Sequence, residues 1–171
     1  WSNSEKLKIQ LDFLQGHESC VACAGLSKVY NEETKKFEGP YNKNPKTDYE
    51  LKDLFGIPPF QIGTLVFRRT ALEPLPDIFK GTISNDKIVY TLLAKNGPVY
   101  CFDKVFSVYR KHAKSISKNN SFEKIYEHQE RLYEAMKTHF GLKWSKKIDR
   151  AEYVHFRAFL KETVRENKLG L

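Results

Sequence analysis

One short stretch of the chain, residues 81–117, holds an acid, a histidine and several cations that could form a reactive site. Asp86 begins an apolar segment with helical spacing, and His112 follows a short aromatic segment together with Arg110 and Lys111. A carboxylate can accept a proton from a hydroxyl group, while imidazole and cations can bind phosphate oxygens. If the helix start and the strand end meet in one cleft, this combination suits chemistry on a phosphate-bearing substrate.

The hydrophobic pattern predicts the helices that must position these residues. Apolar residues recur at helical spacing, which predicts helices over residues 2–16, 47–56, 85–96 and 121–140, and a further helix after Gly141. In the helix over residues 85–96, Ile88, Leu92 and Leu93 are expected to face the core. The Ser/Thr-x-x-Glu spacing predicts capping boxes at residues 2–5 and 47–50.

Short apolar runs between these helices predict strands at residues 20–30, 65–67, 98–102 and 105–110. The first two of these strands are expected to be buried. The polar residues 31–46 are expected to form a hairpin tip or a long loop. Strands that alternate with helices predict an α/β fold with a helical appendage at the C-terminus.

Charge and composition narrow the classes of function. The chain of 171 residues carries a net charge of +8, and the whole excess lies in residues 104–171, with 16 Lys or Arg against 8 Asp or Glu. Such a bias attracts anions, although a solvated helical surface with excess lysine explains it equally well. No run of about 18 apolar residues is present, so no membrane span is expected.

The spacing and surroundings of the three cysteines indicate buried core residues and not a metal site. Cys20 and Cys23 form a Cys-x-x-Cys pair inside an apolar run, and Cys101 is distant in sequence. Because no second pair is present, small buried core residues are expected here. An odd number of cysteines without a disulfide pattern favours a reducing compartment and a cytoplasmic protein.

Three segments occur in an informative order. The chain opens with Trp-x-x-x-x-Lys-Leu-x-x-Gln (residues 1–10), continues with Gly-Thr-Leu-Val-Phe-Arg-Arg (63–69), and then carries Asp86 followed by Tyr-Arg-x-His (109–112). In this order residues 1–117 resemble the C-terminal half of a family 2 glycosyltransferase of GT-A type. The resemblance implies part of a GT-A, Rossmann-like mixed sheet in residues 1–117, with residues 118–171 as a basic helical appendage.

The resemblance also implies roles for individual residues. Asp86 stands where inverting family members carry the general base that deprotonates the acceptor hydroxyl, and His112 matches a histidine beside the metal and the donor diphosphate. Cations near the leaving diphosphate would be Arg110, Lys111 and Lys114. The acceptor site would include Phe60, Gln61 and Thr64. Without the resemblance, Asp86 reads as an acid favoured by the helix dipole.

Two features of the family are absent from this sequence. No Asp-x-Asp motif and no glycine-rich phosphate loop occurs in it. The chain is therefore expected to supply the acceptor side of a transferase and to be inactive alone. The complete enzyme would use a nucleotide-sugar donor, a glycan or lipid-linked acceptor, and Mn²⁺ or Mg²⁺, and this chain alone is not expected to bind the metal tightly.

Two other interpretations remain open. The basic C-terminal helices could form a binding module for an anionic membrane or a nucleic acid, or the chain could be a non-catalytic remnant of a split gene. Acids interleaved with the cations make nucleic acid an unexpected partner. Peripheral contact with the cytoplasmic face of a membrane is compatible with the transferase interpretation, and so is self-association into a homo-oligomer.

Overall fold

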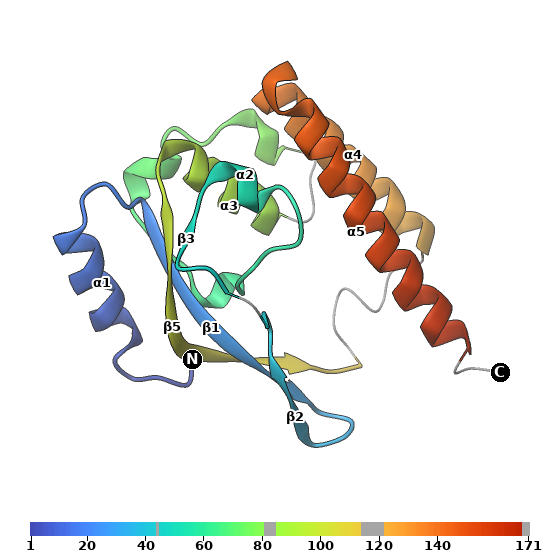
Figure 1. Cartoon of the computed structure of the whole chain (residues 1–171), viewed down its shortest axis with the longest axis horizontal. Helices are drawn as coiled ribbons and strands as arrows, with labels where there is room; N and C mark the ends of the chain where they lie inside the picture. The colour runs from blue at the N-terminus through green and yellow to red at the C-terminus, as the bar shows by residue number, and fades with distance from the viewer. Residues whose placement is uncertain (44, 81–84, 114–121, 169–171) are drawn as a thin grey trace.

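The computed structural model describes residues 1–43, 45–80, 85–113 and 122–168 of the chain. Within these ranges the chain has a mixed α/β fold built on a five-stranded sheet (Figure 1). The elements in chain order are α1 (Lys6–Gly16), β1 (Ala22–Asn31), β2 (Lys36–Pro40), β3 (Asp48–Tyr49), α2 (Leu51–Leu54), η1 (Ile62–Thr64), β4 (Val66–Phe67), η2 (Arg69–Leu72), η3 (Asp77–Phe79), α3 (Asn85–Asn96), β5 (Val99–Lys111), α4 (Phe122–Phe140) and α5 (Leu142–Lys168).

Two parallel strands, β1 and β5, form the centre of the sheet. They pair from Ala22 opposite Val99 to Asn31 opposite Lys111, with register shifts on either side of Leu26. β3 pairs antiparallel with β5, whereas β2 and β4 pair antiparallel with opposite ends of β1. Because parallel neighbours need a crossover connection, the chain between them must pass over a face of the sheet, and α3 belongs to this connection.

Helices cover both faces of the sheet, as Figure 1 shows, with α1 on one side and α2 and α3 on the other. Successive strand residues point to opposite faces. Accordingly, Cys23 of β1 lies in one buried cluster with Leu14 of α1. Its neighbour Ala22 lies in the other cluster, together with Val99 of β5 and Ile88 of α3.

The C-terminal helices α4 and α5 form a hairpin that packs on the α2–α3 side of the sheet (Figure 1). The hairpin turns at Gly141, whose φ of 75° is readily adopted only by glycine. Phe55 of α2 contacts the rings of Phe140 and Trp144, with centroids 5.3 and 5.4 Å apart. The described part of residues 118–171 therefore shares one buried cluster with the sheet layer.

Several predictions from the hydrophobic pattern are confirmed. The fold is mixed α/β, α3 spans residues 85–96, β1 covers most of the predicted strand, and residues 31–40 form a hairpin. The three predicted inward residues of α3 are buried. All three cysteines are buried and free, as expected.

Other predictions were wrong for identifiable reasons. The two strands expected at residues 98–110 form the single strand β5. Register shifts on either side of Leu26 accommodate extra residues of β5, so the whole strand stays paired with β1. β4 contains only two residues and Phe67 is 39% exposed, since the strand pairs only with the start of β1. The predicted strand at residues 65–67 is therefore not buried.

Neither predicted capping box forms. α1 begins at Lys6, and the Glu5 amide donates to Asn3 Oδ1 over 2.9 Å. Before α2, residues 48–49 pair with β5 as β3, so the helix starts only after Glu50. The Glu50 amide then donates to Asp53 Oδ2 over 3.1 Å, which places the cap three residues later than the sequence pattern predicted.

The contact between β1 and β5 at Gly25 gives a test of the fold. A Cβ atom at Gly25 would overlap the Phe106 ring and lie 2.9 Å from the Lys104 carbonyl oxygen. We expect Gly25→Ala to lower the free energy of unfolding by about 1–3 kcal/mol, the typical cost of overpacking. Urea denaturation measures this change.

The matched control is Gly16→Ala at the end of α1, where a Cβ would meet nothing within 4 Å. Because alanine favours helix over glycine, this control is expected to retain or raise stability. Equal stability of both variants would contradict the close approach of β1 and β5.

Candidate functional site

Asp86 lies in the first turn of α3, the helix that immediately precedes β5 in the chain. α3 precedes β5 with only residues 97–98 between them, so the two elements run in opposite directions. The start of α3 is therefore displaced from the start of β5 toward the carboxyl ends of β1 and β5. Ligands of open α/β sheets bind at the carboxyl ends of the strands. Asp86 is exposed, so a substrate can reach it.

The electrostatic surroundings of Asp86 fit a proton acceptor. Loss of hydration raises the pKa of its carboxyl group above the ordinary value. Burial also raises the pKa values of Tyr41 and Tyr90, and the charge of Asp86 adds to both shifts. The Asp86 carboxylate forms no hydrogen bond or salt bridge with the residues that the structure describes. An exposed carboxyl group of raised pKa is a stronger proton acceptor than an ordinary aspartate and is accessible to a hydroxyl group.

The residues expected to bind phosphate lie at the end of β5. Arg110 forms a salt bridge with Glu32, and Lys111 Nζ lies 3.4 Å from Glu38 Oε2, so both cations are partly neutralised by the β1–β2 hairpin. His112 follows the last residue of β5 and is half-buried. The fourth candidate, Lys114, lies outside the described residues.

The three candidate acceptor residues have different surroundings. Phe60 is 2% exposed and packs its ring against Tyr90, and its carbonyl oxygen accepts a hydrogen bond from the Tyr90 hydroxyl over 3.2 Å. Thr64 is fully buried, and its hydroxyl donates to the Gln61 carbonyl over 2.7 Å. Of the three, only Gln61 has a partly accessible side chain. Phe60 connects this segment to α3, the helix that carries Asp86.

A buried polar network begins at Lys87, the residue that follows Asp86 in α3. Lys87 is 3% exposed, and its Nζ lies 2.6 Å from the Tyr133 hydroxyl of α4 and 3.0 Å from His155 Nδ1 of α5. The Tyr133 hydroxyl is 3.2 Å from the same His155 nitrogen, and Nζ also lies over the Tyr133 ring. The network thus joins α3, α4 and α5 through hydrogen bonds inside the protein.

Burial shifts the titration of this network strongly. It lowers the pKa of Lys87 to about 7, although the charge of Glu152 acts in the opposite direction. Burial also lowers the pKa of His155 to about 4, with a further contribution from the charge of Lys87. At neutral pH His155 is therefore uncharged and Lys87 is close to its midpoint.

Sequence reasoning missed this network. No function was predicted for His155 or for Lys87. One signal was present, since Lys87 precedes the buried residues Tyr90 and Thr91 by three and four positions and so shares their helix face. A lysine at an inward position of a helix indicates a buried cation with partners in other elements.

The comparisons with known proteins leave the family open. No family model matches the chain, and no curated protein matches it in sequence. The described residues hold no group of three or more His, Cys, Asp or Glu that could bind a metal ion. In the same part of the chain, every helix is too short or too polar to cross a membrane.

The buried network makes stability depend on pH in a defined direction. Lys87 has a pKa of about 7 in the folded protein against 10.5 for an ordinary lysine, so between these values the unfolded chain binds more protons. Stability should therefore rise as pH increases from 7 to 10. Lys87→Met should remove part of this rise, and urea denaturation at several pH values measures it.

The control for this experiment is Lys95→Met, which removes an exposed lysine from the same helix. It should keep the slope of the original protein, because it leaves the buried amine of Lys87 in place. The same slope in the Lys87→Met variant and the original protein would show that Lys87 is not a desolvated amine.

Proposed function

We propose that this chain is the acceptor side of an inverting glycosyltransferase of the GT-A type, with Asp86 as the general base. The observation that carries the proposal is the accessible, partly dehydrated carboxylate at the start of α3, which is displaced from the start of β5 toward the carboxyl ends of two parallel strands. The resemblance of residues 1–117 to family 2 enzymes is consistent with this position.

In this mechanism Asp86 removes the proton from an acceptor hydroxyl as the oxygen attacks the anomeric carbon of the donor sugar. The bond from that carbon to the diphosphate breaks, and negative charge develops on the leaving group. Cations at the end of β5 would stabilise this charge. Arg110 and Lys111 would first have to exchange their carboxylate partners on the hairpin for phosphate oxygens.

The buried positions of Phe60 and Thr64 refine the proposed acceptor site. Gln61 is the member of this group whose side chain could contact an acceptor, while Phe60 and Thr64 would support the segment around it. A nucleotide-binding half, whose motifs this sequence lacks, would supply the Asp-x-Asp motif. That half would bind the nucleotide-sugar and the metal ion.

The test uses an enzyme in which this chain is joined to a nucleotide-binding GT-A half. Asp86→Asn should lower kcat by about 10²–10⁴-fold, the usual contribution of a general base, with little change in the Kd of the donor. Initial-rate kinetics and calorimetric titration of the donor provide the two values.

Asp103→Asn is the matched control, because it removes an exposed carboxylate from β5 outside the proposed site. It should leave kcat within about twofold. Full activity of the Asp86→Asn enzyme would exclude Asp86 as the base, and weaker donor binding with normal kcat would assign it to the donor site instead.

A second candidate function is contact with an anionic membrane surface, and the outer face of α5 favours it. Tyr153, Val154 and Val164 are 59%, 48% and 50% exposed. Their positions fall on the same helical face as the exposed cations Arg157 and Lys161. Such a mixture of apolar and basic side chains suits the interface between lipid headgroups and acyl chains.

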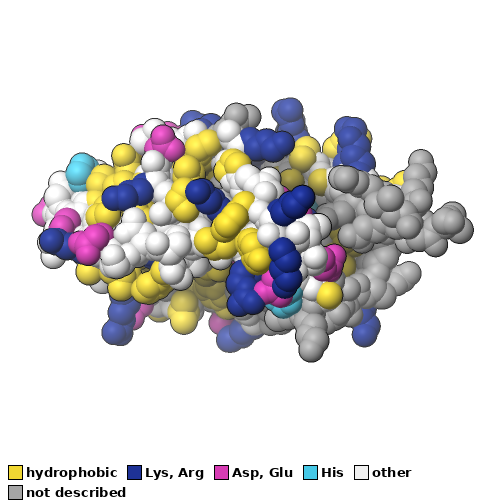
Figure 2. Space-filling model, turned by 90° about the horizontal axis from the view of Figure 1, so that it is seen from below, with side chains coloured by type: hydrophobic (Ala, Val, Ile, Leu, Met, Phe, Trp, Pro, Cys, Tyr) yellow, Lys and Arg dark blue, Asp and Glu magenta, His cyan; other side chains and the backbone are white. Residues whose placement is uncertain are grey.

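On the face of the molecule drawn in Figure 2, the cations do not follow one helix face as they do on α5. Figure 2 shows the molecule from below, where Lys and Arg side chains are scattered among hydrophobic ones over the described part of this face. The membrane proposal therefore depends on α5, where apolar and basic residues share one helical face.

Vesicle sedimentation tests this second candidate. The chain should bind vesicles that contain phosphatidylglycerol and not vesicles of phosphatidylcholine alone. Arg157→Glu should weaken binding by at least about fivefold, since each cation near an anionic surface contributes about 1 kcal/mol. The same charge reversal at the exposed Lys8 of α1 should have little effect, and equal loss in both variants would mean that net charge alone, without α5, governs binding.

A further inference from the structure

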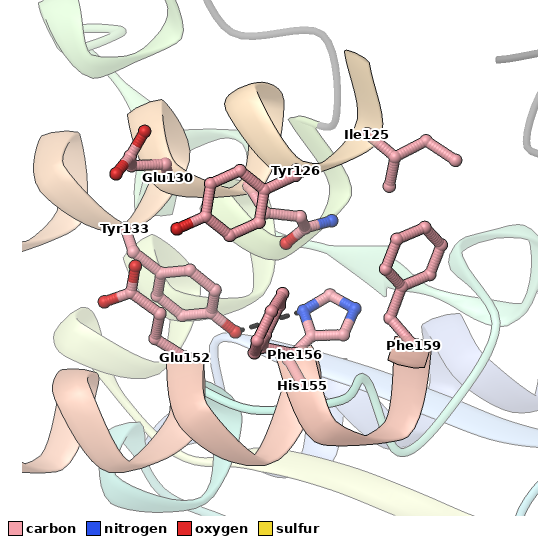
Figure 3. Close-up of a pocket in the computed structure, with 9 residues that line it drawn as sticks. Ile125, Tyr126, Glu130, Tyr133, Glu152, His155, Phe156 and Phe159 are labelled. Carbon is pink, nitrogen blue, oxygen red and sulfur yellow. Dashed lines mark hydrogen bonds between the residues drawn. The ribbon is translucent and has the colours of Figure 1, made fainter. Parts of the chain in front are cut away.

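A small cavity lies between α4 and α5, away from Asp86 and its neighbours. Its volume is about 40 Å³, and most of its walls are apolar or aromatic (Figure 3). The rings of Tyr126 and Phe156 meet edge to face across it, with centroids 5.3 Å apart, and Phe159 lines the same space. Polar side chains also line the cavity, namely those of Gln129, Glu130, Glu152 and His155. A space of this size admits a small chemical group but not a sugar nucleotide.

His155 offers a hydrogen-bond donor to the cavity. Its Nδ1 atom lies 3.0 Å from the Lys87 amine and 3.2 Å from the Tyr133 hydroxyl, and beside a protonated lysine, which can only donate, Nδ1 is the acceptor. Because burial lowers the pKa of His155 to about 4, the ring is neutral and carries its single proton on Nε2. Figure 3 shows Nδ1 turned toward Tyr133 and the opposite edge of the ring turned toward Phe159.

Gln129 offers a hydrogen-bond acceptor. Its Oε1 atom is buried and accepts no hydrogen bond from any residue that the structure describes. A buried acceptor without a donor costs about 1–3 kcal/mol, so a ligand that donates to it gains correspondingly. The cavity thus combines one donor and one acceptor within aromatic walls.

The charges around the cavity favour a neutral ligand. Glu130 and Glu152 lie at its wall and would repel an anion, although Lys137 Nζ pairs with Glu152 at 3.0 Å. At the His155 end of the cavity, where the head group of the ligand would lie, a cation would be repelled by the amine of Lys87, 3.0 Å from His155 Nδ1. A hydroxyl group carries no charge and both accepts and donates a hydrogen bond.

We propose that the cavity between α4 and α5 binds the hydroxyl group of a small apolar alcohol. The alcohol oxygen accepts a hydrogen bond from His155 Nε2 and donates one to Gln129 Oε1. The apolar remainder of the ligand packs against Tyr126, Phe156 and Phe159 at the mouth of the cavity. This site uses none of the residues proposed for sugar transfer.

Four probes that differ only in their head group test the proposal. Benzyl alcohol, toluene, benzylamine and benzoate are each titrated into the complete chain, and binding is followed by NMR shifts of the Ile125 methyl groups and the His155 ring. Benzyl alcohol should bind at least about tenfold more tightly than toluene, as expected for two hydrogen bonds. It should also bind more tightly than both charged probes.

Gln129→Leu removes the acceptor with little change in volume. In this variant the preference for benzyl alcohol over toluene should fall to about threefold or less, since only the His155 contact remains. Gln15→Leu, the same change at an exposed position of α1, should keep the full preference. The thermal midpoints of both variants show whether each is folded.

Several results would overturn the proposal. Equal binding of benzyl alcohol and toluene would show that the cavity is only hydrophobic. Tighter binding of benzylamine or benzoate would show that a charge governs recognition. Shifts confined to residues outside α4 and α5, or a preference unchanged by Gln129→Leu, would place the alcohol elsewhere.

Discussion

The parallel pairing of β1 and β5 is the constraint on which the rest of this structure depends. Two parallel strands cannot be joined by a tight turn, so the connection between them crosses a face of the sheet and includes α3. α3 then runs back against β5, which places Asp86 toward the carboxyl ends of both strands. The same pairing places Arg110 opposite Tyr30, and therefore close to Glu32 at the tip of the hairpin.

α3 also connects this region to the C-terminal hairpin. Asp86 and Lys87 are neighbours in the chain, yet one is exposed and the other is almost fully buried. The buried amine holds Tyr133 and His155 in place, and His155 in turn lines the cavity between α4 and α5. One helix thus carries the proposed base on its outer side and fixes the hairpin from its inner side.

Local sequence patterns predicted the helices and strands better than the contacts between them. The spacing of Ile88 and Leu92 was sufficient for α3, because a helix forms from contacts within a few residues of the chain. The salt bridge of Arg110 and the pairing of β3 with β5 join residues at least 50 positions apart, and no local pattern contains them. The buried network was missed for the same reason, since it combines residues 87, 133 and 155. The position of Asp86 at the start of a helix was predictable because it depends on the local pattern alone.

The most direct measurement of the central claim is the pKa of Asp86, obtained by following its side-chain carboxyl carbon by NMR during a pH titration of the complete chain. A general base beside Tyr41 and Tyr90 is partly dehydrated, so the account predicts a midpoint above the ordinary value for aspartate. An acid that serves only to complement the dipole at the start of α3 would titrate below that value. A lowered midpoint would therefore contradict the role of Asp86 as a poised base.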